Sequence, residues 1–134
     1  MARKVVLAGA CRTAIGVMGG QFANTSAVEL GTIVIKEALK RAGVSPDQVD
    51  EVYMGNVIQA GNGQNPARQA AVYAGIPNEV PATTINVLCG SGLHCVNLAA
   101  KLIAAGDADI IVAGGMENMT MAPYMLRNGR LWIS

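Results

Sequence analysis

Short apolar runs alternate along the chain with longer stretches in which apolar residues recur every three or four positions. Four runs predict buried strands: residues 5–8, 51–58, 83–87 and 109–113. Three stretches predict helices: residues 27–42, 66–74 and 90–105. Because strands and helices alternate, the pattern predicts an α/β fold with a largely parallel sheet.

Residues typical of helix starts and ends mark the limits of the first two helices. Ser26 and Glu29 have the spacing of a capping box, and Gly43 stands at the usual stop position. Asn65 comes directly before Pro66, a pair that predicts the first turn of the second helix.

The third helix differs from the first because it is apolar on almost every side. Only a narrow stripe is polar: His94, Asn97 and Lys101. A helix of this kind is normally buried all round, which a single sheet layer does not achieve. The hydrophobic fraction is 51%, and the charged fraction is 14% against about 25% in typical domains. We therefore expect apolar surface that faces a second domain or a second subunit.

Composition also excludes several classes of partner. The net charge is +1 and like charges do not cluster, so neither nucleic acid nor a membrane surface is an expected partner. The longest apolar stretches are interrupted by Gly, Asp or Pro well short of a membrane span. The first residues lead directly into strand-like sequence, and the three cysteines predict free thiols. A cytoplasmic, reducing location is the expectation.

The motif NVLCGSGL places Cys89 where an apolar run changes into a helix. Backbone N–H groups at a helix start carry partial positive charge, which favours a thiolate and can hold an oxyanion. The next three residues, Gly90 to Gly92, leave room for a substrate carbonyl to reach the sulfur. This arrangement predicts a nucleophile. A packed, unreactive cysteine is the alternative, because free cysteines are often buried.

Other uses of the same residues fit the spacing less well. On a helix, Cys89 and Cys95 stand about 600° of rotation and ~9 Å of rise apart, beyond the reach of a disulfide. A zinc site that adds His94 and Cys11 fails because the two helical cysteines do not share a face. His94 is roughly 140° away from Cys89 on the helix and does not easily reach the sulfur. The chain therefore offers a nucleophile and no evident base.

Four separated motifs, in this order along the chain, resemble those of the thiolase family: RTAIG, GQNPARQAA, NVLCGSGL and AAKLIAAGDADIIVAGGMENMTMAPY. The resemblance runs from residue 4 to residue 124 and is closest to the acetyl-CoA acetyltransferases of the family. It implies the N-terminal half of a five-layered αβαβα sandwich, with a mostly parallel, mixed sheet and a buried central helix. Residues 1–118 would form the N-terminal α/β domain, and residues 119–134 the start of a loop domain.

The resemblance also implies a reaction. Cys89 would be the nucleophile of an acyltransferase, taking an acetyl group from acetyl-CoA or acetoacetyl-CoA as a covalent thioester, with its backbone N–H as an oxyanion donor. A second acetyl-CoA, deprotonated at its methyl carbon, would attack that thioester. Coenzyme A thioesters would be substrates, with no resident cofactor and no metal. The full-length protein would be a homodimer or a homotetramer.

The chain departs from the family pattern in three ways. The family motifs N-E-A-F, G-H-P and C-G-G do not occur, so we expect the chain to be truncated and inactive alone. Cys95 stands where the family usually has a small residue, and the ending RNGRLWIS does not follow the family's continuation. The open alternatives are a longer-chain 3-ketoacyl-CoA thiolase or a related condensing enzyme, and a non-catalytic module that binds a partner through its apolar face.

Overall fold

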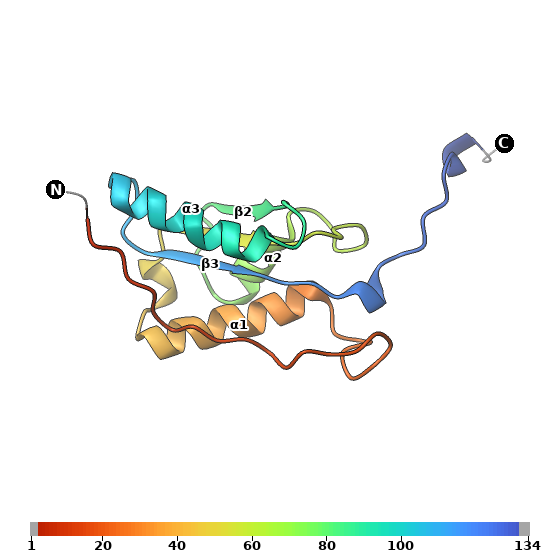
Figure 1. The fold of residues 1–134 in the computed structure, drawn as a ribbon, viewed down its shortest axis with the longest axis horizontal. Helices are drawn as coiled ribbons and strands as arrows, with labels where there is room; N and C mark the ends of the chain where they lie inside the picture. Colours follow the sequence, from red (N-terminus) through yellow and green to blue (C-terminus); the bar gives the residue numbers. More distant parts are fainter. Residues whose placement is uncertain (1–2, 132–134) are drawn as a thin grey trace.

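Three parallel strands form the sheet at the centre of the chain (Figure 1). The computed structural model describes residues 3–131. The strands are β1 (Glu51–Gly55), β2 (Ala82–Ile85) and β3 (Ile111–Gly115), and the helices are α1 (Ala27–Ala42), α2 (Pro66–Tyr73) and α3 (Ser91–Ala105). Short 3₁₀ turns cover Pro46–Gln48, Met119–Met121 and Gly129–Leu131. The predicted α/β fold with a parallel sheet is confirmed.

The sheet has α3 on one face and α1 with α2 on the other (Figure 1). The strand order is β2-β1-β3, and the last residue of β1, Gly55, is opposite Ile85 of β2 and Gly115 of β3. Because the strands are parallel, their carboxyl ends meet at one edge, and α3 begins at that edge (Figure 1). Open parallel sheets bind their ligands at this edge. The fold therefore puts the start of α3 where a site is expected.

The main core lies between the sheet and the helices α1 and α2. Alanines along α2 let α1 and the sheet approach closely, and larger aliphatic side chains fill the remaining space. Its buried members include Ala27, Val28, Ile35, Leu39, Val49, Val52, Met54, Ala67, Ala70, Ala71, Ala74, Ile76 and Met116. This core anchors one face of the sheet without any contribution from α3.

Both predicted helix starts are confirmed. Ser26 Oγ accepts a hydrogen bond from Glu29 N–H (3.1 Å), and Glu29 Oε2 accepts one from Ser26 N–H (2.6 Å). The bond from the Ser26 backbone holds the pKa of the Glu29 carboxyl below its usual value. Asn65 Oδ1 accepts from Arg68 N–H (3.2 Å) at the start of α2. α1 ends at Ala42, and the next residue, Gly43, has the left-handed backbone (φ 66°) that favours glycine.

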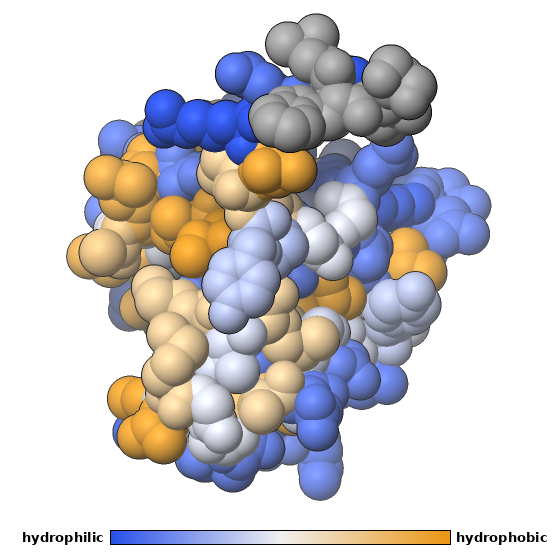
Figure 2. All heavy atoms as spheres, turned by 90° about the vertical axis from the view of Figure 1, so that its right-hand side faces the viewer, coloured by the Kyte–Doolittle hydropathy of each residue, from blue (hydrophilic) through white to orange (hydrophobic). Residues whose placement is uncertain are grey.

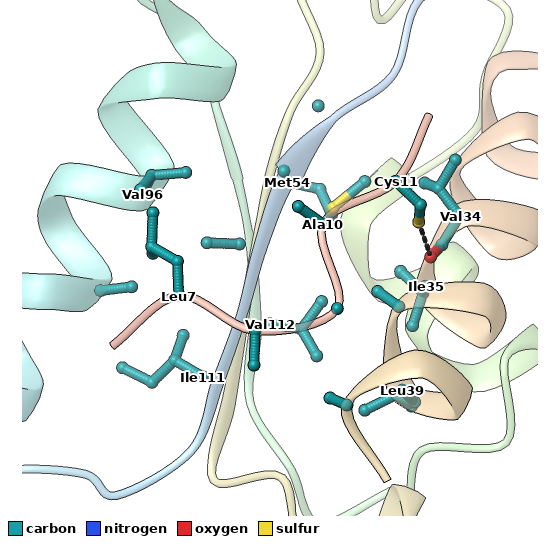
Figure 3. A pocket seen from close by; sticks show the side chains of 18 of the residues that line it. Leu7, Ala10, Cys11, Val34, Ile35, Leu39, Met54, Val96, Ile111 and Val112 are labelled. Carbon is teal, nitrogen blue, oxygen red and sulfur yellow. Dashed lines mark hydrogen bonds between the residues drawn. The ribbon is translucent and has the colours of Figure 1, made fainter. Parts of the chain in front are cut away.

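The predicted strand over residues 5–8 is wrong, because this part of the described chain joins no sheet. The segment runs beside α1, where Cys11 Sγ donates to Val34 O (3.4 Å) and Arg41 Nη1 donates to Ala10 O (3.2 Å). A cavity of about 610 Å³, lined mostly by apolar side chains, lies between the segment and β3 (Figure 3). An apolar run meets the burial requirement of a strand, but pairing also needs a neighbouring backbone within hydrogen-bonding distance.

Two strands end earlier than predicted. β1 ends at Gly55 rather than at residue 58, because the Glu117 carboxylate accepts hydrogen bonds from Val57 N–H (2.8 Å) and Ile58 N–H (3.3 Å). β2 ends at Ile85 rather than at residue 87, because the turn toward α3 begins there. After β1, the contacts with Glu117 replace the ladder hydrogen bonds of a longer strand.

In this chain α3 is buried along one side only. Its buried residues are Ser91, Cys95 and Ala99, whereas Leu93 is 69% exposed. Contrary to the sequence expectation, the segment Leu88–Ala105 is long and apolar enough to cross a membrane, by length and composition alone. Its packing against β1 and β3 fits a helix between protein layers better. The layer predicted to cover the outer side of α3 stays a prediction.

Asp50 fastens the start of β3 to the residues before β1, and this contact predicts a pH dependence. Asp50 Oδ2 accepts from Ile110 N–H (2.9 Å) and Asp109 N–H (2.8 Å), which holds the pKa of this carboxyl below its usual value. A lowered folded-state pKa stabilises the fold above pH ~4, and the stabilisation is lost as pH falls through that pKa. Because the carboxylate is exposed, Asp50→Asn should lower the free energy of unfolding by less than about 1 kcal/mol near neutral pH.

Thermal unfolding followed by circular dichroism across the acid range tests this prediction. The difference in Tm between the unaltered chain and Asp50→Asn should shrink as Asp50 becomes protonated. Asp107→Asn is the matched control, because Asp107 is also exposed and its side chain makes no hydrogen bond to the described residues. A difference that does not change with pH would contradict the assignment.

Candidate active site

Cys89 lies on the turn that joins β2 to α3, at the carboxyl edge of the sheet. The residue is exposed, and it precedes Gly90, which caps the helix without a side-chain hydrogen bond. Cys89 is therefore just outside α3 rather than on it, so the helical angles predicted between Cys89 and later residues do not apply. Its predicted place at the start of a helix, where backbone N–H groups lack intrahelical partners, agrees with the structure.

Two neighbouring side chains hold this turn. Leu88, directly before the cysteine, has a left-handed backbone (φ 58°), and Asn86 Oδ1 accepts a hydrogen bond from its N–H (3.1 Å). Ser91 Oγ accepts from Val87 N–H (2.9 Å) and donates to Leu88 O (2.6 Å). In the described chain no hydrogen bond from Cys89 N–H is found. The backbone around the cysteine is thus fixed, and an isolated β-bridge also joins Val87 to Cys89.

Sequence reasoning missed the roles of Asn86 and Ser91. A signal for Asn86 was present, because an asparagine two residues before a strained position is typical of a turn closed by its side chain. Ser91 gave a weaker signal of its role in the turn. A serine between two glycines is first interpreted as one more small residue, and not as a hydrogen-bonding partner of the backbone.

Glycines bring the ends of β1 and β3 against the first residues of α3. A Cβ atom on Gly55 would lie 2.7 Å from Ser91 Cβ and 2.9 Å from Gly92 N. A Cβ on Gly115 would lie 3.3 Å from Gly92 Cα. The absence of side chains at these positions lets the helix start rest directly on the strand ends. The sheet therefore fixes where the turn that carries Cys89 ends and α3 begins.

A chain of hydrogen bonds connects the turn to the end of β3. Asn86 Nδ2 donates to Val57 O (3.2 Å), in the segment after β1. Glu117 holds that segment, because its carboxylate accepts from Val57 N–H (2.8 Å) and from Asn56 Nδ2 (3.0 Å). Asn56 is 1% exposed, and its Nδ2 also donates to Met116 O (3.2 Å). The polar groups beneath the turn are satisfied, which makes this support rigid.

The other two thiols are less accessible than Cys89. Cys95 is fully buried (0% exposed), and burial raises the pKa of its thiol. Cys11 is half-buried against α1, and all three cysteines are free, as predicted. His94 is exposed on α3 with Asn97 and Lys101, so the predicted polar stripe is confirmed.

The thiol of Cys89 opens onto the surface rather than into a cavity. Cys89 does not line the cavity beside β3, nor a second cavity of about 450 Å³ between residues 13–18 and residues 117–120. Figure 2 looks at the side of the molecule that includes this edge, and apolar side chains gather on that side. Within residues 3–131, no three His, Cys, Asp or Glu side chains are grouped to hold a metal ion. The described part of the chain therefore offers an exposed thiol at a helix start, and Cys89 lines neither of these two cavities.

These features define an α/β domain that presents an exposed free cysteine at the carboxyl edge of a parallel sheet. The family described as "Thiolase, N-terminal domain" matches residues 5–132. The chain belongs to the thiolase family and corresponds to its N-terminal domain.

Curated relatives agree with this assignment. An acetyl-CoA acetyltransferase of Cupriavidus necator is 61% identical over 126 residues, covering 94% of this chain and 32% of the relative. One of Syntrophomonas wolfei is 58% identical over 130 residues, covering 97% of this chain and 33% of the relative. A probable acetyl-CoA acyltransferase of Staphylococcus epidermidis is 50% identical over 127 residues, covering 95% and 32%.

The chain spans about a third of the length of the curated relatives it matches. The predicted domain boundary at residue 118 stays a prediction. Of the segment 119–134, predicted to begin a loop domain, residues 132–134 lie outside the described part of the chain.

Proposed function

We propose that this chain is the N-terminal part of an acetyl-CoA acetyltransferase, which condenses two acetyl-CoA molecules to acetoacetyl-CoA and carries out the reverse thiolysis. The observation that carries the proposal is the exposed Cys89 at the start of α3, followed by Gly90 and held on a fixed turn. Relatives of that name, 54% to 61% identical, support the choice of reaction.

Cys89 acts first, as the acyl acceptor. Its thiolate attacks the carbonyl carbon of acetyl-CoA, a new carbon–sulfur bond forms, and the bond to the coenzyme A sulfur breaks. Coenzyme A leaves as a thiolate that takes a proton. Negative charge develops on the carbonyl oxygen during this step, and backbone N–H groups at the helix start, that of Cys89 among them, stabilise it.

The second step forms the carbon–carbon bond. A base removes a proton from the methyl carbon of a second acetyl-CoA, and the resulting carbanion attacks the acetyl-cysteine carbonyl. The Cys89 thiolate is released as the leaving group, which returns the enzyme to its starting state. We place this base in the two thirds of the full-length protein that the chain does not span.

The other features of the proposal concern the full-length protein. Coenzyme A thioesters are its substrates without a resident cofactor, and it forms a homodimer or homotetramer in the cytoplasm. The exposure of Leu88 and Leu93, both 69%, supports a further contact surface beside the site. A longer-chain 3-ketoacyl-CoA thiolase is the second candidate, supported by the relative named probable acetyl-CoA acyltransferase.

Cys89 should be the first thiol to react and the one that carries the acyl group. Iodoacetamide at neutral pH should modify Cys89 before Cys11 and Cys95, because the other two are half-buried and buried. Incubation with acetyl-CoA should add one acetyl group to Cys89, located by mass spectrometry of peptides. The Cys89→Ala variant should lose this modification.

Cys11→Ala is the matched control and should keep the acetylation, since Cys11 lies against α1, outside the turn. Faster alkylation of Cys11 or Cys95 in the folded chain would contradict the assigned nucleophile. Alkylation of Cys89 without acetylation by any acyl-CoA would favour the non-catalytic module. Comparison of acetyl-CoA with longer acyl-CoA thioesters separates the two candidate enzymes.

A further inference from the structure

We propose that Asn86 is a positioning residue for the Cys89 nucleophile, acting by holding Leu88 in its left-handed conformation. The inference rests on the proposed role of Cys89 and deepens it. In this assignment Asn86 touches neither the sulfur nor a substrate, so its role is indirect. Asn86 instead fixes the orientation of the turn, and that orientation determines where the Cys89 sulfur and the Cys89 N–H point.

The strain lies at Leu88. A leucine with φ of 58° adopts a region that residues with a Cβ atom rarely occupy, and such residues persist where the surroundings over-determine them. The Leu88 side chain is 69% exposed, so its own burial does not compensate for the strain. Within the described chain, the compensation comes from the hydrogen bonds of the turn.

Asn86 supplies the hydrogen bond that holds the N–H of the strained residue. Its Oδ1 accepts from Leu88 N–H (3.1 Å), and its Nδ2 donates to Val57 O (3.2 Å). The oxygen of the Asn86 amide therefore bonds to the turn, and its nitrogen bonds to the segment after β1. Ser91 holds Val87 N–H and the carbonyl of Leu88, but leaves the Leu88 N–H to Asn86.

Val57, whose carbonyl accepts the hydrogen bond from Asn86 Nδ2, is itself held in place. Val57 N–H donates to the Glu117 carboxylate (2.8 Å), so the carbonyl of the same residue that receives Asn86 Nδ2 does not move freely. Glu117 also accepts from Ile58 N–H (3.3 Å). Asn86 thus links Leu88, the residue before Cys89, to the segments that follow β1 and β3.

Loss of the Asn86 amide should therefore disturb acyl transfer more than simple thiol reactivity. Alkylation needs only an accessible thiolate, whereas acylation also needs N–H donors aligned on the carbonyl oxygen. We expect Asn86→Ala to slow acetylation of Cys89 by acetyl-CoA about 10- to 100-fold. Iodoacetamide alkylation of Cys89 should change by no more than about fivefold, the size of a lost helix-terminus effect.

Rescue at the strained position separates positioning from general damage. In the double variant Asn86→Ala with Leu88→Gly, glycine adopts a left-handed backbone without strain, so acetylation should recover part of the loss. Asn97→Ala is the matched control, because Asn97 is an exposed asparagine further along α3 and its side chain makes no hydrogen bond within the described residues. It should leave both rates unchanged.

The outcomes are distinguishable within one set of samples. Slower acetylation with near-normal alkylation, partly restored by Leu88→Gly, supports the proposal. Equal acetylation of Asn86→Ala and the unaltered chain overturns it, and so does faster alkylation of the buried Cys95, which would report general unfolding. If the unaltered chain is alkylated but not acetylated, the proposed function fails for this chain. Asn86 is then judged on the stability of the turn: a lower Tm of Asn86→Ala that Leu88→Gly partly restores supports the proposal, and an unchanged Tm overturns it.

Discussion

Replacing Gly55 by alanine should displace the start of α3 and remove most of the acyl-accepting activity of Cys89. The new Cβ would lie 2.7 Å from Ser91 Cβ and 2.9 Å from both Gly92 N and Ser91 C. Two of these three atoms are backbone, so rotation of a side chain does not relieve the contact. The helix start must move by about 1 Å to reach ordinary contact distances.

This movement has two measurable consequences. Overpacking at a buried position costs about 1–3 kcal/mol of stability. Misplacement of the turn on this scale should slow acetylation of Cys89 about 100-fold. The free energy of unfolding from urea titration and the acetylation rate measured by mass spectrometry test the two effects separately.

Gly114→Ala is the matched control on the neighbouring strand. A Cβ on Gly114 would meet Met54 Sδ at 3.2 Å, and that atom is near the end of a flexible side chain that can turn away. We expect stability and acetylation close to those of the unaltered chain. Equal behaviour of the Gly55 and Gly114 variants would show that the strand ends do not set the position of the helix start.

Local signals predicted the helices well because their ends are determined by neighbours in sequence. The Ser26 and Glu29 capping box and the Asn65 cap each use contacts within three residues, and each is present as predicted. The thiol at a strand-to-helix turn was also predictable, because NVLCGSGL combines an apolar run, a cysteine and small residues before a helical stretch.

The features that sequence reasoning missed depend on distant partners. The end of β1 is set by Glu117, some sixty residues further along, and the turn before Cys89 depends on Asn86 reaching Val57. The run at residues 5–8 has the composition of a buried strand, yet the described chain gives its backbone no neighbour. Pairing and support of this kind are fixed by the tertiary arrangement, which periodicity does not encode.

The chain by itself should not turn over acetoacetyl-CoA, although Cys89 should still accept an acetyl group. Condensation and thiolysis both need a positioned acid or base, which contributes about 10²- to 10⁴-fold to the rate. His94, the single histidine of the sequence, is exposed on the polar stripe of α3. Glu117 is engaged by two backbone N–H groups, and burial together with Glu51 raises the pKa of Tyr53 to about 12. A phenol with that pKa stays protonated at neutral pH and does not act as a base.

Acetoacetyl-CoA cleavage, followed by the fall in its absorbance, tests this in two stages. The 134-residue chain alone should give the uncatalysed rate. Addition of the remaining part of the full-length protein, expressed separately, should raise the rate if the two parts associate, and Cys89→Ala should abolish the gain. Turnover by the chain alone that disappears in Cys89→Ala would contradict the prediction. It would mean that a base is present among these residues, and His94→Ala would be the first variant to test, because imidazole is the side chain most often used as a general base.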